Sequence, residues 1–323
     1  MRIQLPTLGF GGAPLGNMFK AVPDDQAQAT LEAAWQAGIR YYDTSPHYGA
    51  GRSETRFGEF LADKPRDDYV LSSKVGRLLE PAKQPENAKP FTDELPNRRV
   101  IDYSADGARR SIESSLERLG VDRLDVVFIH DVSEDQHGPK WREYFTEAMQ
   151  GAAVALTRMR EEGMIRGWGL GVNLVEPCRL ALEQADPDVF LLAGRYTLLD
   201  HREALDTLLP ECARRDVGIV VGGPFNSGVL AGGDHYEYDR VPEDIREKTE
   251  QLRTLGKRFG VDIRAAALQF CLANPVVQSV IPGTATPARP AQYVSLLEAA
   301  IPADFWQALR EQGILPEDAP LPC

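Results

Sequence analysis

Four side chains with acid, base or donor chemistry lie at the ends of three consecutive apolar runs. The run IRYYDT contains Asp43, and Tyr48 follows five residues later; DYVLSSK ends in Lys74 and LDVVFIH ends in His130. The carboxyl ends of neighbouring parallel strands meet at one rim of a barrel. These four side chains are therefore predicted to converge on one small volume.

This combination of side chains suits proton transfer at a substrate oxygen. A free tyrosine has a pKa of about 10, which is too high for a proton shuttle near neutrality. An ammonium beside a phenol favours the phenolate, so Lys74 is expected to lower the pKa of Tyr48 while Asp43 keeps Lys74 charged and aimed. His130 can hydrogen-bond the substrate oxygen. Asp131, directly after it, can tune that histidine or contact a polyol.

Taken singly, each of the four residues also has an ordinary structural explanation. Asp43 can cap a turn, and Tyr48 can be a half-buried loop aromatic. Lys74 can be a solvated strand end, and His130 can be a satisfied core residue. The hypothesis of an active site depends on four residues of suitable chemical type occurring together at the ends of three adjacent strands.

The elements that must position these residues alternate along the chain. Short apolar runs bounded by Gly or Pro predict strands, and longer segments of helical period predict helices. The predicted strands cover 8–11, 39–44, 68–74, 124–130, 165–173, 189–196, 218–224 and 278–283. The predicted helices cover 24–37, 53–61, 104–119, 143–162, 175–184, 204–215, 243–259 and 263–273.

This alternation predicts an α/β fold, a single-domain (β/α)8 TIM barrel over residues 1–323. A doubly wound dinucleotide-binding fold is the alternative, because GFGGAPLG at 9–16 is superficially similar to a Gly-rich fingerprint. That segment contains Pro14 and opens no clear helix. No acidic residue closes a following strand at the distance that such a fold requires.

A long polar stretch, rich in Pro, Lys and Asn, follows the third predicted strand at 77–103. A loop of this length inside a domain is usually a functional lid or a disordered excursion. In a barrel it would lie over the catalytic face. We therefore expect it to form part of the substrate pocket.

Composition argues against several classes of partner. The 36 Lys and Arg against 48 Asp and Glu give a formal charge of −12, which disfavours nucleic acid and anionic membranes. No apolar stretch approaches the ~20 residues of a membrane span, and the N-terminal segment lacks the apolar core of a secretion signal. No metal is expected, because the five histidines show no ligand spacing. A cytoplasmic location is expected, because the four cysteines are interpreted as reduced thiols: Cys178, Cys212, Cys271 and Cys323.

Longer motifs around the four residues resemble the aldo-keto reductase superfamily. They occur in order along essentially the whole chain: YYDTSPHYGAGRSETRFGEFL (41–61), SSKVG (72–76), VVFIHD (126–131), WGLGVN (168–173) and VIPGTATP (280–287). The resemblance implies a TIM barrel that binds NAD or NADP in an extended pose, without a Rossmann domain. It also implies that the four residues form the catalytic tetrad, Asp43, Tyr48, Lys74 and His130.

The same resemblance implies cofactor contacts residue by residue. Asn173 matches the amide that binds the nicotinamide carboxamide. The segment 222–230 matches the one that wraps the pyrophosphate, and its expected contacts are Gly223, Pro224, Phe225, Ser227 and Gly228. The segment 282–292 matches the adenosine-phosphate segment, with Thr284, Thr286, Arg289 and Gln292. An ordinary Gly/Pro turn and a helix N-cap stay open as the alternatives for these two segments.

Departures from the family pattern bear on the choice of cofactor. Gly283 and Ala285 stand where many NADPH-preferring members place a lysine and an arginine, which leaves Arg289 to grip a 2′-phosphate. This favours NAD, or the use of both cofactors, over strict NADP. Ala193 and Gly222 stand where a nicotinamide-binding glutamine and a stacking aromatic are common.

Within the superfamily, PHYGAGRSE, SSKVGRLL, LLAGRYTLLD and GGPFNSGVL resemble the branch that contains D-threo-aldose 1-dehydrogenase, L-fucose dehydrogenase and pyridoxal 4-dehydrogenase. This resemblance implies a small-molecule substrate, an aldose whose anomeric carbon is oxidised to a lactone with Tyr48 as acid/base. The alternatives are pyridoxal dehydrogenation, general NADPH-dependent aldehyde reduction, and a non-catalytic cofactor-sensing subunit. Five residues are expected to line the substrate pocket: Phe19, His47, Arg77, Asp131 and Trp141.

Overall fold

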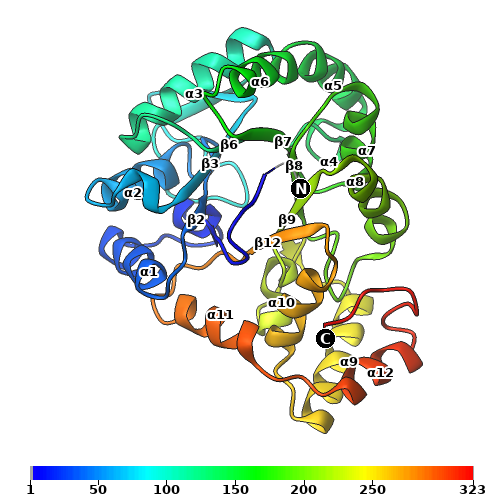
Figure 1. Cartoon of the computed structure of the whole chain (residues 1–323). Coiled ribbons are helices and arrows are strands. Elements are labelled where there is room, and N and C mark those ends of the chain that lie inside the picture. Colours follow the sequence, from blue (N-terminus) through cyan, green and yellow to red (C-terminus); the bar gives the residue numbers. More distant parts are fainter. Residues whose placement is uncertain (1–2, 323) are drawn as a thin grey trace.

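A computed structural model describes residues 3–322, in which eight parallel strands form one barrel (Figure 1). In spatial order the strands are β1 (Phe10–Gly11), β2 (Tyr41–Asp43), β3 (Val70–Val75), β6 (Val126–His130), β7 (Gly167–Val172), β8 (Val189–Ala193), β9 (Gly218–Gly222) and β12 (Val277–Ile281). Parallel bridges between Leu8 and Val280 and between Gly11 and Gly283 join the last strand to the first. The predicted (β/α)8 barrel is confirmed, and the doubly wound alternative, whose sheet stays open, is excluded.

A ring of helices surrounds the barrel in Figure 1. The helices are α1 (Asp24–Gln36), α2 (Arg52–Leu61), α3 (Ala105–Leu119), α4 (Glu134–His137), α5 (Trp141–Gln150), α6 (Ala152–Glu161), α7 (Val175–Gln184), α8 (Leu209–Arg215), α9 (Glu243–Phe259), α10 (Ile263–Ala273), α11 (Arg289–Glu298) and α12 (Ala303–Glu311). Among the described residues, no helix is long and apolar enough to cross a membrane. Cys178, Cys212 and Cys271 are buried free thiols, and Cys323 lies outside the described residues.

The helix predicted over 143–162 is two helices, α5 and α6, separated at Gly151. A Cβ on Gly151 would lie 2.8 Å from the Cα of Ser104 and 2.8 Å from the carbonyl oxygen of Tyr103. The amide of Ala152 donates to that same oxygen at 2.9 Å. The chain therefore turns at Gly151 because it packs directly against the start of α3, a tertiary contact that periodicity does not reveal.

Alternation along the strands divides the apolar side chains into two cores, because successive side chains of a strand point to opposite faces. Val126 and Phe128 of β6 belong to a small cluster inside the barrel, and Val127 and Ile129 belong to the large cluster between barrel and helices. Ile3 also joins the inner cluster. The inner cluster makes the barrel a packed scaffold rather than a pore, so the strand ends hold their side chains firmly.

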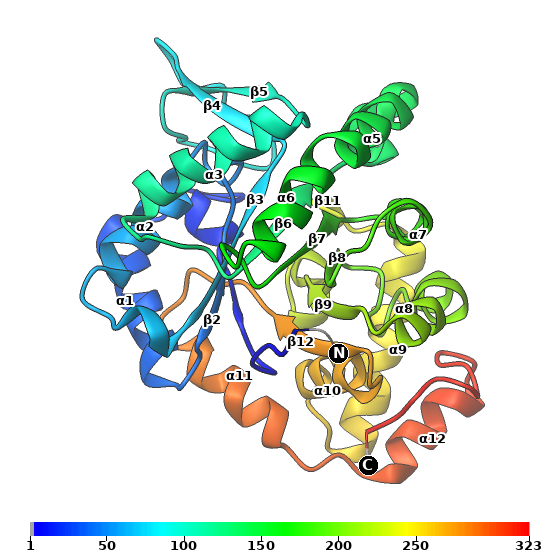
Figure 2. The same cartoon turned by 45° about the horizontal axis from the view of Figure 1, so that its top comes forward.

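Two antiparallel hairpins lie outside the barrel. One is formed by β4 (Arg77–Pro81) and β5 (Asn97–Ile101), and it projects beside α3 in Figure 2. The other is formed by β10 (His235–Tyr236) and β11 (Asp239–Arg240). The stretch expected as a long loop does follow β3, but its two arms pair, so it is an ordered hairpin rather than a disordered excursion.

Candidate active site

Strand alternation explains why Asp43, Lys74 and His130 converge. Each residue continues the inward-facing set of its own strand: Asp43 comes two residues after Tyr41, and His130 comes two after Phe128. Lys74 follows Ser72 in the same way on β3. The three strands β2, β3 and β6 are neighbours in the barrel. The side chains beyond the inner core therefore meet at the carboxyl-end rim.

Lys74 and Asp43 form a buried ion pair at this rim. The Lys74 Nζ donates to Asp43 Oδ2 at 2.7 Å and to the carbonyl oxygen of Thr44 at 2.8 Å. Ser72 Oγ donates to the other carboxylate oxygen of Asp43 at 2.7 Å. A Cβ on Gly171 of β7 would lie 3.5 Å from Lys74 Cε, so a glycine there leaves room for the lysine. The two charges satisfy each other, and both side chains are almost fully buried.

Tyr48 lies on the turn between β2 and α2, beside that ion pair. The Lys74 Nζ is 4.7 Å from the centre of the Tyr48 ring. The rings of Tyr48 and His130 are 5.8 Å apart and nearly perpendicular, at 83°. Gly16 allows this placement, because a Cβ on Gly16 would lie 2.5 Å from the carbonyl carbon of Tyr48. The structure therefore brings the four predicted side chains together.

Ser45 fixes the His130 ring. Its Oγ lies 3.0 Å from His130 Nδ1 and accepts the backbone N–H of His47 at 3.1 Å. If the Ser45 hydroxyl donates its proton to Nδ1, then the hydroxyl, the His130 Nδ1 and the His47 N–H each have a hydrogen-bond partner. The proton of a neutral imidazole is then on Nε2. Burial lowers the pKa of His130 well below its ordinary value, and Arg77 and Lys74 lower it further. The arrangement favours a neutral ring with an Nε2–H donor.

The pKa of Tyr48 departs from the expectation drawn from the sequence. Burial raises the pKa of the phenol well above its ordinary value, and the carboxylates of Asp43 and Asp131 raise it further, while Arg77 lowers it. The expectation that the pKa of Tyr48 lies below its ordinary value is wrong for the protein alone. The physical reason is that Asp43 offsets the charge of Lys74, and a phenolate loses its hydration in the buried site.

A cavity of about 720 Å³ opens directly above this group. Its lining includes Tyr48, Lys74, His130 and Asn173, together with residues from the two hairpins, among them Phe91 and Tyr238. Three cationic side chains (Lys74, Lys89 and Arg240) and three anionic ones (Asp131, Glu237 and Asp239) line it. Because these charges balance, the cavity suits an uncharged polar molecule.

The five residues expected to line the substrate pocket divide into three groups. Phe19, His47 and Asp131 line the cavity. Arg77 lies behind Asp131, to which its Nη1 donates at 2.6 Å, so it supports the wall. Trp141 does not lie there: it begins α5, is 4% exposed, and packs against Phe145 in the outer core. A bulky apolar ring is more stable in that core than at a polar rim.

The predicted nicotinamide side of the cofactor site adjoins the cavity. A side pocket of about 200 Å³ is lined by Asn173, Gly223 and Ser227, and also by Asn226. Asn226 is 4% exposed, and its Oδ1 has no hydrogen-bond partner among the described residues. A buried acceptor without a partner is costly. It fits a ligand with N–H or O–H donors, which the carboxamide and ribose of NAD(P) carry.

The predicted adenosine end lies after β12. The Oγ1 of Thr284 accepts the amide of Thr286 at 3.0 Å, and Gln292 Oε1 accepts from Arg264 at 3.4 Å. The Phe225 ring is 5.8 Å from Tyr293, so the segment containing Pro224 and Gly228 packs against this region. Arg289 is exposed, as a contact to a phosphate requires. These residues could hold the cofactor as one extended surface.

Several lining residues were not predicted. Phe91 comes from the loop of the β4–β5 hairpin, and its ring lies 5.8 Å from that of Tyr48. Tyr238 comes from the β10–β11 hairpin, and its hydroxyl donates to Asn173 Oδ1 at 3.4 Å. No periodicity marks these short hairpins. For Ser45, the signal was present: a hydroxyl two residues after Asp43, on the same strand end.

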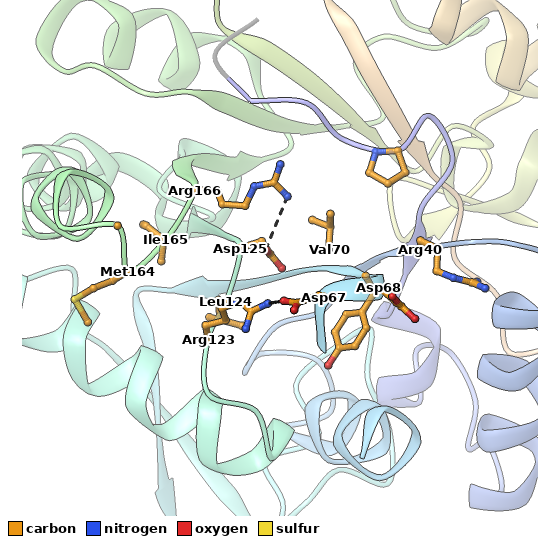
Figure 3. A pocket seen from close by; sticks show the side chains of 13 residues that line it. Arg40, Asp67, Asp68, Val70, Arg123, Leu124, Asp125, Met164, Ile165 and Arg166 are labelled. Atoms are coloured by element: carbon orange, nitrogen blue, oxygen red, sulfur yellow. Dashed lines mark hydrogen bonds and ion pairs between the residues drawn. The ribbon is translucent and has the colours of Figure 1, made fainter. Parts of the chain in front are cut away.

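Another cavity, of about 400 Å³, lies at the amino-terminal ends of the strands and contains none of the four residues (Figure 3). Arg123 pairs with Asp67 there, and Arg166 lies 3.9 Å from Asp125. Catalytic residues of TIM barrels lie at the opposite end. We therefore place the site at the carboxyl-end rim.

Comparisons with known proteins agree with this geometry. The model of the Aldo/keto reductase family matches residues 7–313. The chain is 40% identical to D-threo-aldose 1-dehydrogenase from Pseudomonas sp, covering 97% of this chain and 96% of that protein. It is 38% identical to pyridoxal 4-dehydrogenase from Microbacterium luteolum, covering 97% and 95%.

Among solved structures, an aldo/keto reductase from Klebsiella pneumoniae in complex with NADP and acetate has the same fold. Its TM-score is 0.68 at 22% identity, over 98% of this chain and 95% of that one. The family match spans nearly the whole chain, and two curated relatives exceed 30% identity. The chain therefore belongs to the aldo/keto reductase family, as an oxidoreductase acting on CH–OH groups.

Proposed function

We propose that this enzyme is an NAD(P)-dependent aldose 1-dehydrogenase, which oxidises the anomeric carbon of an L-fucose or D-threo-aldose type sugar to a lactone. The observation that carries the proposal is the meeting of Tyr48, Lys74, Asp43 and His130 beneath a cavity whose charges balance. The 40% identity to a D-threo-aldose 1-dehydrogenase supports the substrate class.

The residues have distinct roles in this reaction. His130 donates its Nε2–H to the oxygen on C1 and positions it. Tyr48, as phenolate, removes the proton from that hydroxyl while the C1–H bond breaks, so that a C1=O bond forms. NAD(P), when bound, would supply the acceptor for the hydride and its two electrons from C1. Lys74 over the phenol ring, held by Asp43, stabilises the negative charge before the transfer.

In this proposal Asn173 binds the nicotinamide carboxamide, and the segment 223–228 wraps the pyrophosphate. The segment 284–292 binds the adenosine phosphate. Arg289 is exposed and is the expected cationic contact to a 2′-phosphate. Because Gly283 and Ala285 add no further cation there, we propose use of NAD, or of both NAD and NADP, rather than strict use of NADP. A cytoplasmic location stays a prediction from the sequence.

A second candidate is oxidation of pyridoxal, favoured by the 38% identity to a pyridoxal 4-dehydrogenase. Pyridoxal, which forms an aromatic hemiacetal with little net charge near neutral pH, would also fit the charge balance of the cavity, with Phe91 and Phe19 as walls. General aldehyde reduction with NADPH is the reverse of this reaction and would use the same four residues. A non-catalytic cofactor-sensing subunit would not require these four residues, so their presence argues against that alternative.

Purified protein should be incubated with NAD+ or NADP+ and each of L-fucose, D-arabinose, L-galactose, L-xylose and pyridoxal, while NAD(P)H absorbance is followed. We expect oxidation of at least one sugar, with the lactone identified by NMR. Turnover of pyridoxal without any sugar would replace the proposal by the second candidate. Tight cofactor binding without turnover of any compound would favour the sensing subunit.

A further inference from the structure

His47 is held by the β4–β5 hairpin with one ring nitrogen engaged. Arg99 Nε donates to His47 Nδ1 at 2.7 Å, and Arg99 Nη2 donates to the His47 carbonyl oxygen at 2.8 Å. A guanidinium can only donate hydrogen bonds, so Nδ1 must present its lone pair. The proton of a neutral His47 is therefore on Nε2.

Arg99 is itself fixed in this position. Its guanidinium pairs with the buried carboxylate of Glu94 and lies 3.1 Å from Glu86. Glu94 also accepts the amide of Ala88 at 2.9 Å, which ties the loop of the hairpin to the same network. The edge-to-face contact between His47 and Phe91, at 5.2 Å, holds the ring from another side. A flip of the His47 ring would break the bond to Arg99.

The ring of His47 is neutral near physiological pH. Burial lowers its pKa well below the ordinary value, and Arg77, Arg99 and Lys74 lower it further. No hydrogen bond among residues 3–322 uses its Nε2, although His47 lines the cavity. The ring centres of His47 and His130 are 5.8 Å apart. The cavity wall therefore carries two neutral N–H donors on neighbouring rings.

We propose that His47 is a specificity-determining residue that donates its Nε2–H to the hydroxyl on C2, the carbon next to the one that reacts. The inference rests on the proposed function, in which His130 holds the oxygen on C1. Two donors on rings whose centres are 5.8 Å apart can each reach one of two oxygens on neighbouring carbons. A sugar without a C2 hydroxyl leaves the buried N–H unpaired, which makes it a poorer substrate.

The test compares each sugar with its 2-deoxy counterpart. For wild-type enzyme, kcat/KM should be about tenfold or more higher for L-fucose than for 2-deoxy-L-fucose, and likewise for D-arabinose over 2-deoxy-D-ribose. In His47→Phe, which keeps a ring but no donor, the ratio should fall to within about twofold of one. His47→Gln, which keeps an N–H donor, should restore part of the ratio.

Phe19→Leu is the matched control, because Phe19 lines the same cavity and stacks on His235 rather than on His47, and the change should alter kcat/KM for a sugar and for its 2-deoxy counterpart alike. Cofactor affinity, measured by fluorescence, reports whether each variant is folded. A wild-type enzyme that oxidises L-fucose with an equal kcat/KM for the 2-deoxy sugar overturns the inference and leaves the proposed function standing. So does an unchanged ratio in a folded His47→Phe variant. If wild-type enzyme oxidises none of the sugars in the panel, the proposed function fails, and the inference fails with it.

Discussion

At the scale of single side chains, the state of the Tyr48 phenol depends on charges that offset one another. Lys74 lies above its ring, but Asp43 is 2.7 Å from the Lys74 ammonium, and Asp131 adds a further negative charge nearby. Burial then favours the uncharged phenol. Near neutral pH the protein alone therefore holds a proton donor at this position. Sugar oxidation, which needs the phenolate, is expected to accelerate as pH rises.

Two measurements on Tyr48→Phe check this state. The variant should lose about 10²–10⁴-fold in kcat, because the acid/base group is gone, while cofactor affinity stays the same. The ultraviolet difference between wild type and variant, without cofactor, should show no phenolate from Tyr48 up to a pH of about 10. A phenolate signal near neutrality would contradict the raised pKa of Tyr48. Near-normal turnover of the variant would remove its acid/base role.

At the scale of elements, sequence periodicity predicted the scaffold well and the additions to it poorly. The helices α7, α9 and α10 begin and end where the sequence predicts, because their apolar faces pack on the barrel and set the pattern. The split at Gly151 and the pairing of β4 with β5 depend on contacts between distant segments. Phe91 and Tyr238 were not predicted for the same reason, since they lie in these hairpins. Asp43, Lys74 and His130 were predicted because they lie at the carboxyl ends of neighbouring strands.

Gly151→Ala tests the reason given for the helix break. The added methyl would contact Ser104 and Tyr103 at 2.8 Å, which forces α6 away from the start of α3. We expect a loss of about 1–3 kcal/mol in the free energy of unfolding, measured by urea denaturation. Val154→Ala on the exposed face of α6 is the control, expected to change stability by about 0.5 kcal/mol or less. Equal stabilities for wild type and Gly151→Ala would refute the packing explanation.

At the scale of the whole molecule, several buried histidines make the fold sensitive to acid. Burial lowers the pKa values of His47, His130, His137 and His201 in the folded chain. The unfolded chain binds these protons near the ordinary value of 6.5. Below that pH the unfolded state therefore takes up more protons than the folded state, and stability falls as pH decreases.

His201→Gln isolates this effect, because His201 lies in the outer core against Phe270, away from the candidate site. Wild-type Tm should fall between pH 7.5 and 5.5, with each such histidine contributing at most about 1.4 kcal/mol per pH unit below 6.5. The variant should show a shallower fall over the same range in thermal denaturation. Parallel curves for the two proteins would show that His201 is not part of the acid response.

The closure of the barrel has a consequence for how the molecule opens. Strand β1 contributes two residues to the sheet, and its contact with β12 is completed by the Gly9 amide on Val280 and the Val280 amide on Thr7, each at 2.9 Å. Because the contact between β1 and β12 is so short, it should open before any other part of the barrel. The Gly9 and Val280 amides are therefore expected to exchange with deuterium early. The proposed adenosine contacts begin directly after β12. A tightly held dinucleotide would then slow that exchange, and occupancy could be followed by mass spectrometry without any turnover.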